Sequence, residues 1–243
     1  MYYNSEFIVL KRINYADNDR IVTLLSPDKG KITAIAKGSR KLTSRLAAGI
    51  ELFTHCKGHF AKGRNLDILT QVELIQPFSS LRTNFDLINK IFYLLELCYT
   101  TVQEQQENTE IFDLLYNTLD TIQNNTAISA ASVTFFEMKL LSILGFRPQL
   151  YTCTNCNQPL TTVVKCGVVD HGIICWQCLK SSNNSYCLIT ISGDQLKQMQ
   201  KLQGINWDNY LTCCDSFFPV NQIPGIFLEG IIGKKLKTKK CFL

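Results

Sequence analysis

Four cysteines are spaced as metal ligands. Cys153 and Cys156 form one Cys-x-x-Cys pair, Cys175 and Cys178 form a second, and 18 residues separate the two pairs. Each pair can supply half of a tetrahedral thiolate shell, and a hairpin between the pairs brings the halves together. Because four thiolates leave no open position for a substrate, the pattern predicts one structural zinc ion and no catalytic metal.

Two alternatives to this four-cysteine site stay open. The cysteines could be reduced thiols of a site that has lost its metal, and Cys166 or His171, which lie between the pairs, could replace a ligand. A redox role explains two pairs at ribbon spacing less well than one shared ion does. Eleven cysteines in 243 residues are about 4.5% of the chain, which is below the content of disulfide scaffolds and favours reduced thiols.

Cations are concentrated in residues 37–45, which read KGSRKLTSR and contain four cations and no acid. Cationic and hydroxyl side chains in a loop are typical contacts of nucleic-acid phosphates. We therefore predict a DNA-binding surface here; a loop that merely aids solubility is the alternative. The predicted contacts are Lys37, Arg40, Lys41 and Arg45, supported by Lys11, Arg12 and Arg20 on neighbouring segments.

Aromatic residues near this segment could stack on bases. The candidates are Tyr15, Phe53, His55 and Phe60. For Phe53 and Phe60 we favour a place in the core of the folded domain, because phenylalanine is among the residues most often buried.

The elements that position these groups begin with five short β-type runs, at residues 6–10, 20–25, 31–36, 50–61 and 66–75. Turn residues separate several of them, and Pro27 and Gly30 supply the fixed and the positive φ that a chain reversal needs. Five short strands without an intervening helical pattern predict a small closed barrel, for which the OB-fold is the natural candidate. We assign an OB-fold DNA-binding domain to residues 1–80.

A helical region follows the predicted barrel. Between residues 81 and 147, apolar side chains recur with a helical period, as in Phe85, Ile88, Phe92, Leu95 and Tyr99. We assign a helical domain to residues 81–243 with the zinc ribbon embedded at about 151–185, so the predicted fold class is α+β. The end of the chain carries five lysines within residues 234–240, which could bind phosphates, stabilise a helix C-terminus or simply be solvated.

Charge and composition narrow the function classes. The net charge of +5 divides into +5 over residues 1–80, −4 over 81–149 and +4 over 150–243, and two basic regions suit an anionic partner as well as a solvated surface. No apolar run approaches the roughly 18 residues of a membrane span and the start lacks a signal pattern, so we expect a cytoplasmic protein without a membrane partner. P-loop, G-x-S-x-G and H-E-x-x-H motifs do not occur, so we expect neither an enzyme nor a small-molecule substrate.

The order of these segments resembles the bacterial DNA repair protein RecO family, in its zinc-containing type. The resemblance spans essentially the whole chain and is carried by GKITAIAKGSRK near the start, FLEGIIGKKLKTKK at the end and the four spaced cysteines. One departure is that Asn157 and Leu179 follow the second cysteine of each pair, where many such ribbons have glycine. The resemblance implies an N-terminal OB-fold, a helical domain and an embedded zinc ribbon.

The resemblance also implies a function. Members of the family bind single- and double-stranded DNA, anneal complementary strands, and act with RecR to load RecA onto DNA coated with single-stranded-DNA-binding protein (SSB). The chain would then serve DNA repair and homologous recombination (the RecF pathway) in the cytoplasm, at the nucleoid. An acidic SSB tail that ends in an apolar residue would need a cation beside an apolar cleft, which the sequence does not place. Two other classes stay open: a zinc-ribbon transcription or translation factor, and a protein adaptor without annealing activity.

Overall fold

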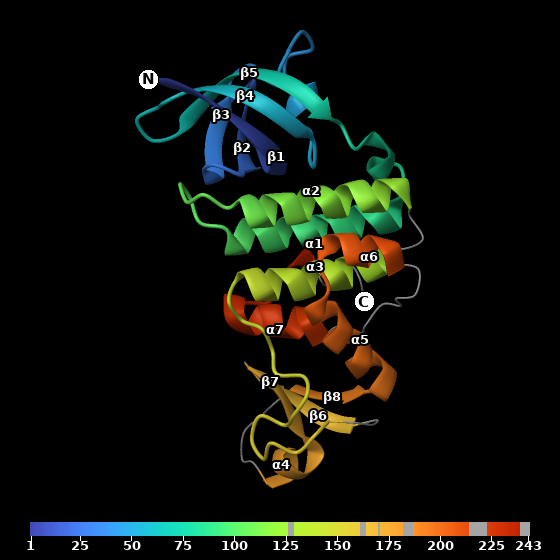
Figure 1. Cartoon of the computed structure of the whole chain (residues 1–243). Helices are drawn as coiled ribbons and strands as arrows, with labels where there is room; N and C mark the ends of the chain where they lie inside the picture. Colours follow the sequence, from blue (N-terminus) through green and yellow to red (C-terminus); the bar gives the residue numbers. More distant parts are fainter. Residues whose placement is uncertain (126–128, 161–163, 170, 182–186, 214–222, 239–243) are drawn as a thin grey trace. The chain divides into compact units, whose positions relative to one another are not determined.

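The computed structural model of the chain describes all residues except 126–128, 161–163, 170, 182–186, 214–222 and 239–243 (Figure 1). Its contacts divide the chain into two compact units, Met1–Thr126 with Leu236–Leu243, and Ala127–Lys235. The first unit holds a barrel and two helices, and the second holds the remaining helices and a small sheet. Compact units and domains need not coincide, so the division into residues 1–80 and 81–243 stays a prediction.

Five strands of the first unit form a closed barrel in the order β1-β2-β3-β5-β4 (Figure 1). Neighbouring strands are antiparallel except β3 and β5, which are parallel. A closed five-stranded barrel is the OB-like fold that the sequence predicted. The strands are β1 (Tyr2–Tyr15), β2 (Asp19–Ser26), β3 (Gly30–Ala36), β4 (His55–Ala61) and β5 (Asp67–Gln76).

Alternation along the strands builds the barrel core. In β3 every second residue is buried, so Ile32, Ala34 and Ala36 point inward and their neighbours point outward. These side chains pack with fully buried Phe7 and Phe60 from β1 and β4. The core therefore uses apolar residues that the alternating sequence pattern had placed on one face.

The predicted strand over 50–61 is too long at its start, because β4 begins only at His55. The preceding residues form a short 3-10 helix at Ala48–Ile50, and Phe53 takes a left-handed conformation with φ 56°. The Thr54 hydroxyl donates to the carbonyl oxygens of Gly49 (3.0 Å) and Glu51 (2.7 Å). Such local hydrogen bonds compete with strand pairing and keep this segment in a turn.

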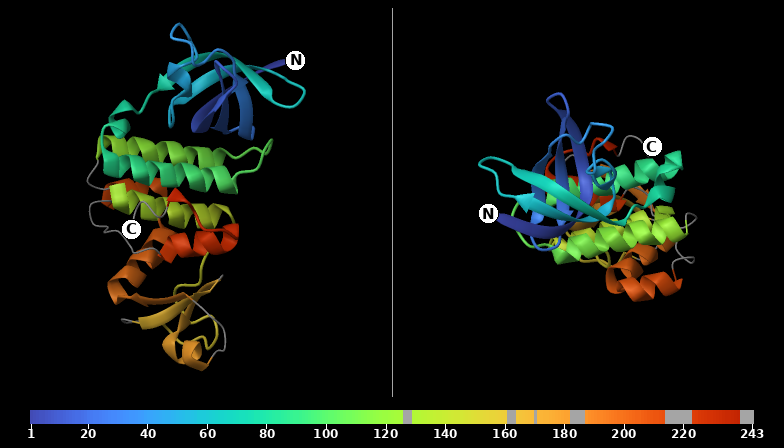
Figure 2. Two further views of the ribbon diagram at one scale, coloured as in Figure 1. Left: turned by 180° about the vertical axis from the view of Figure 1, so that it is seen from behind. Right: turned by 90° about the horizontal axis from the view of Figure 1, so that it is seen from above.

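Two helices complete the first unit, α1 (Phe85–Thr101) and α2 (Thr109–Asn124), and they contact each other as Figure 2 shows. Asn84 and Asn108 cap their N-termini by accepting backbone N–H groups. Gly30 faces the connection between the helices with φ 60°, and a Cβ on it would lie 2.2 Å from the carbonyl oxygen of Gln106. The end of the chain returns to this unit, where the Glu96 carboxylate on α1 accepts the backbone N–H of Thr238 at 2.8 Å.

The second unit combines helices with a three-stranded sheet in the order β7-β6-β8 (Figure 1). Helix α3 packs against α5 and α7, and its Phe135 stacks on Tyr210 of α6 with ring centroids 4.1 Å apart. The bounds are α3 (Ser129–Ile143), β6 (Val164–Val169), β7 (Gly172–Cys175), α4 (Trp176–Ser181), β8 (Cys187–Ile191), α5 (Gly193–Gly204), α6 (Trp207–Cys213) and α7 (Ile223–Ile232). The predicted helical region is thus confirmed. Across the described ranges, no helix is both long and apolar enough to span a bilayer.

Candidate metal centre and nucleic-acid interface

The four cysteines of the predicted zinc ribbon meet in space. The sulfur atoms of Cys153, Cys156, Cys175 and Cys178 all lie within 4.8 Å of one another. The sulfurs of Cys156 and Cys175 are 3.8 Å apart. A tetrahedral zinc ion with Zn–S bonds of about 2.3 Å has sulfur–sulfur edges of about 3.8 Å. The donor set and its dimensions therefore fit one tetrahedral metal ion.

The two pairs come from different local structures. Cys153 and Cys156 lie on a tight turn that Asn157 closes with φ 59°, a left-handed conformation that asparagine tolerates. The N–H of Thr154 donates to the carbonyl of Ile173 at 3.0 Å and holds this turn against β7. Cys175 ends β7 and Cys178 lies in α4. Residue 179 therefore continues a helix, and the leucine there has no need of the positive φ that a glycine knuckle adopts.

Backbone donors prepare one of the thiols for a metal. The N–H groups of Cys175 (3.3 Å) and Asn155 (3.4 Å) both point at the Cys153 sulfur. Burial of Cys153 opposes its ionisation, but these donors, together with the backbone N–H and the thiol of Cys156, outweigh burial and lower its pKa to about 6. The Asn155 side chain lowers the pKa of Cys178, yet the neighbouring thiols outweigh it and raise that pKa to about 12. A bound cation would have to displace the remaining protons, since metals bind thiolates.

The two alternative ligands lie outside the cluster. Cys166 stands opposite Cys175 in the β6–β7 pairing, fully buried, and burial raises the pKa of its thiol to about 11. His171 is exposed. Among the described residues the metal-ligand cluster contains the four predicted cysteines and neither of these two.

The cationic segment forms a loop that is tied to the β1–β2 hairpin. The guanidinium Nη1 of Arg40 donates to the carbonyl oxygens of Ala16 (3.3 Å) and Asp17 (3.1 Å). The backbone N–H of Gly38 donates to the Asp19 carboxylate at 2.7 Å. Arg40 therefore holds the loop in place with one arm of its guanidinium, which stays exposed.

The other predicted loop contacts are free to meet a ligand. Lys37, Lys41 and Arg45 are exposed, and within the described part of the chain none of them forms an ion pair. The Lys41 side chain lies close to Gly38, where a Cβ would be 3.8 Å from its Cδ. Ser39 is different, because it is only 1% exposed and cannot reach a phosphate without rearrangement.

The supporting cations differ in exposure and in whether an acid neutralises them. Lys11 is exposed, with its ammonium 4.9 Å from the centre of the Tyr99 ring on α1. Arg12 is ion-paired with Glu51, which neutralises it locally. Arg20 is half-buried on β2. Lys31 on β3, a further cation of the neighbouring segments, lies 5.2 Å from the same Tyr99 ring. The sequence did not indicate this contact, because only the packing of α1 on the barrel brings these residues together.

The aromatic candidates for base stacking divide into buried and exposed residues. Phe53, His55 and Phe60 are at most 5% exposed, so none of them offers a face for stacking. The preference for core positions at Phe53 and Phe60 is confirmed. Tyr15, at the end of β1, is 48% exposed.

Comparison with known proteins identifies the family of this chain. Family models described as the N-terminal and C-terminal parts of recombination protein O match residues 1–78 and 84–214. The chain belongs to the recombination protein O (RecO) family. The matched ranges include the whole barrel, the cationic loop and the four cysteines of the cluster.

Several relatives carry the name DNA repair protein RecO. A protein of Roseiflexus sp. (strain RS-1) is 40% identical over 177 residues, which are 72% of this chain and 62% of the relative. A Dehalococcoides mccartyi protein is 33% identical over 202 residues, covering 83% of this chain and 78% of the relative. A Desulfitobacterium hafniense protein is 28% identical over 246 residues and covers 97% of this chain and 87% of the relative.

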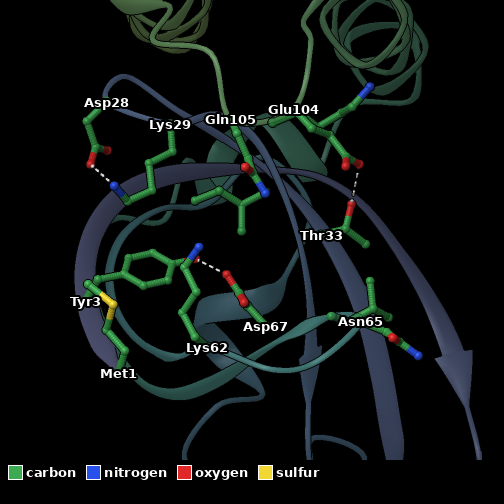
Figure 3. A pocket seen from close by; sticks show the side chains of 13 residues that line it. Met1, Tyr3, Asp28, Lys29, Thr33, Lys62, Asn65, Asp67, Glu104 and Gln105 are labelled. Atoms are coloured by element: carbon green, nitrogen blue, oxygen red, sulfur yellow. Dashed lines mark hydrogen bonds and ion pairs between the residues drawn. The ribbon is translucent and has the colours of Figure 1, made fainter.

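A pocket of about 390 Å³ lies beside β1 (Figure 3). Some of its polar groups bind one another: Lys29 pairs with Asp28 at 3.3 Å, and the Tyr3 hydroxyl donates to Asp67 at 2.5 Å. The Lys29 ammonium also lies 5.1 Å from the centre of the Tyr3 ring. Polar and charged side chains make up most of the lining, which also includes Lys31 and Lys62.

Proposed function

We propose that this RecO-family chain is a mediator of DNA repair and homologous recombination that binds single- and double-stranded DNA through its barrel. The observation that carries the proposal is the exposed cationic loop, tied by Arg40 to the β1–β2 hairpin. Lys37, Lys41 and Arg45 are its main phosphate contacts, and the exposed part of Arg40 adds to them. Lys11 and Arg20 extend the surface along the barrel, whereas Arg12 contributes least because Glu51 already neutralises it.

Annealing by this surface needs no bond chemistry, so we propose that the protein is not an enzyme. Two strands repel each other through their phosphates, and a cationic surface that neutralises both lowers the cost of bringing complementary bases together. A loop with fixed position and uncommitted cations suits this task, because it contacts phosphates without reading base sequence.

The four-cysteine cluster supports a structural role for zinc. An ion held by Cys153, Cys156, Cys175 and Cys178 would join the turn that carries the first two cysteines to β7 and α4. Four thiolates leave no position for a substrate, so the metal would stabilise the ribbon and would take no part in annealing.

The partners that we propose follow from the family. RecR and SSB would bind this chain, and together with RecR it would load RecA onto SSB-coated DNA in the cytoplasm, at the nucleoid. None of these contacts is assigned to particular residues.

The test is strand annealing without ATP, with complementary oligonucleotides precoated with the cognate SSB. We expect rapid annealing by the wild-type protein and a loss in a Lys37→Ala, Lys41→Ala, Arg45→Ala triple variant. Lys57→Ala is the matched control, because this exposed lysine on β4 stands between Glu6 and Glu73 on the adjacent strands. No annealing of bare or coated strands would contradict the proposal and favour a protein adaptor or a zinc-ribbon factor.

A further inference from the structure

Tyr15 presents an exposed aromatic ring at one end of the barrel. It is the last residue of β1, pairs with Asp19 of β2 and is 48% exposed. The next residue, Ala16, has φ 48° and begins the turn of the hairpin. Tyr2 is also exposed, at 77%, but it lies at the opposite end of the same strand.

The turn that carries Tyr15 is fixed to the cationic loop by four hydrogen bonds. Two run from the Arg40 guanidinium to the carbonyls of Ala16 and Asp17, and a third runs from the Arg40 N–H to the carbonyl of Asn18 at 3.0 Å. The fourth joins the Gly38 N–H to the Asp19 carboxylate. The turn next to Tyr15 is therefore fixed to the loop before any ligand arrives, so less backbone freedom is lost on binding.

The surroundings of the ring suit a base and its phosphate. Lys37, Lys41 and Arg45 are exposed on the tied loop, and Leu42 between them is fully exposed. The hairpin also carries two acids, Asp17 and Asp19, but the Asp19 carboxylate is engaged by the loop backbone. Residues 15–20 and 37–45 together carry five cations and two acids, so this hairpin and loop attract phosphates while the exposed ring offers an apolar face.

We infer that Tyr15 is a base-stacking platform through which the barrel prefers single-stranded to double-stranded DNA. This inference rests on the proposed function. An exposed ring next to a turn that is tied to the cationic loop can stack on an unpaired base, whose face is accessible, while the bases of a duplex are already stacked on one another. Phosphate contacts of the loop are common to both kinds of DNA, so the ring is the element that distinguishes them.

The experiment compares strands with and without bases. Binding is measured by fluorescence anisotropy with an oligothymidine and with an abasic strand of the same length, for the wild type and for Tyr15→Ala, Tyr15→Leu and Tyr15→Phe. Loss of one stacked base weakens binding about 5- to 150-fold. We expect a loss in that range for the Ala and Leu variants on oligothymidine, less than about twofold on the abasic strand, and wild-type affinity for the Phe variant.

The controls separate this inference from the proposed function. Tyr2→Ala removes an exposed tyrosine from the far end of β1 and should bind both strands like the wild type. Equal weakening of both strands by the Ala and Leu variants, or none, would overturn the stacking role while DNA binding stands. A wild-type protein that binds neither strand would overturn the proposed function and the inference together. Because Leu keeps a larger apolar side chain than Ala but has no ring, that variant reports on stacking even if the Ala variant folds poorly.

Discussion

Removing the three uncommitted cations of the loop should change how DNA binding depends on salt. Lys37, Lys41 and Arg45 are exposed and make no ion pair with any described residue, so each can neutralise one phosphate. Every phosphate neutralised on a single strand releases counterions and adds about 0.7 to the slope of log K against log salt. The triple alanine variant should therefore lose about 2.1 from that slope.

This change in slope has a measurable consequence. Between about 50 and 200 mM salt, a slope of 2.1 corresponds to a change of about 18-fold in the binding constant. Over this range, the factor by which the wild-type affinity falls should thus be about 18 times the factor for the triple variant. At high salt the two proteins should bind with similar affinity, because the counterion contribution is then small.

Anisotropy titrations on one oligonucleotide at five salt concentrations give the slope directly. Single variants at the three positions should each lose about 0.7, and the losses should add, because each contacts a different phosphate. Lys57→Ala removes the same charge from the same barrel, but Glu6 and Glu73 stand opposite it on the neighbouring strands, so its slope should be that of the wild type.

An unchanged slope in the triple variant would refute the reasoning, because it would mean that the loop neutralises no phosphates. A change in Lys57→Ala as large as that of a single loop variant would also refute it, since the effect would then reflect the overall charge of the protein and not the position of the loop.

Three further predictions concern stability and anchoring. Cys153→Ser should lower the zinc content and the melting temperature, measured by metal analysis and calorimetry, whereas Cys166→Ala should keep the metal; a Cys153→Ser variant with wild-type zinc and melting would disprove the site. Burial opposes ionisation of Asp28, but hydrogen bonds from two serine hydroxyls and a neighbouring lysine lower its pKa below the usual 3.8. A carboxyl group with a lowered pKa in the folded state stabilises the fold above pH 3.8, and this stabilisation is lost as the pH falls below that value. In urea titrations, the free energy of unfolding should therefore fall less steeply with decreasing pH for Asp28→Asn than for the wild type. Glu96→Ala should release the C-terminal segment, because its carboxylate accepts two backbone N–H groups and the Thr238 hydroxyl there; hydrogen exchange at residues 236–238 should quicken, and unchanged exchange would contradict this anchoring.

Features that depend on neighbouring residues were predictable from the sequence. The metal cluster follows from two pairs of cysteines, because the residues of each pair are close along the chain and one hairpin suffices to join the pairs. The barrel strands follow from alternating apolar residues, as in β3, and Gly30 has the positive φ that its turn required. The cations of the loop are close together in the sequence, so their concentration could be identified without the tertiary structure.

The start of β4 shows where such local patterns mislead. Residues 50–54 have the composition of a strand, but the Thr54 hydroxyl binds two carbonyls of its own segment and Phe53 turns into the core. A strand is decided by its partner and by competing hydrogen bonds, and neither is visible in the residue types alone.

The roles of individual side chains were decided by the tertiary structure. Four aromatic residues were candidates for stacking, two of them with a preference for the core, and burial leaves only Tyr15 of these four accessible. Arg12 and Arg40 looked alike in the sequence, yet one is neutralised by Glu51 and the other fastens the loop to the hairpin. Glu96 meets Thr238 across 142 positions of the chain. The sequence by itself determined which chemistry is present, because spacing sets local geometry; only folding decided which groups are exposed, paired or neutralised, because those properties depend on segments that are distant along the chain.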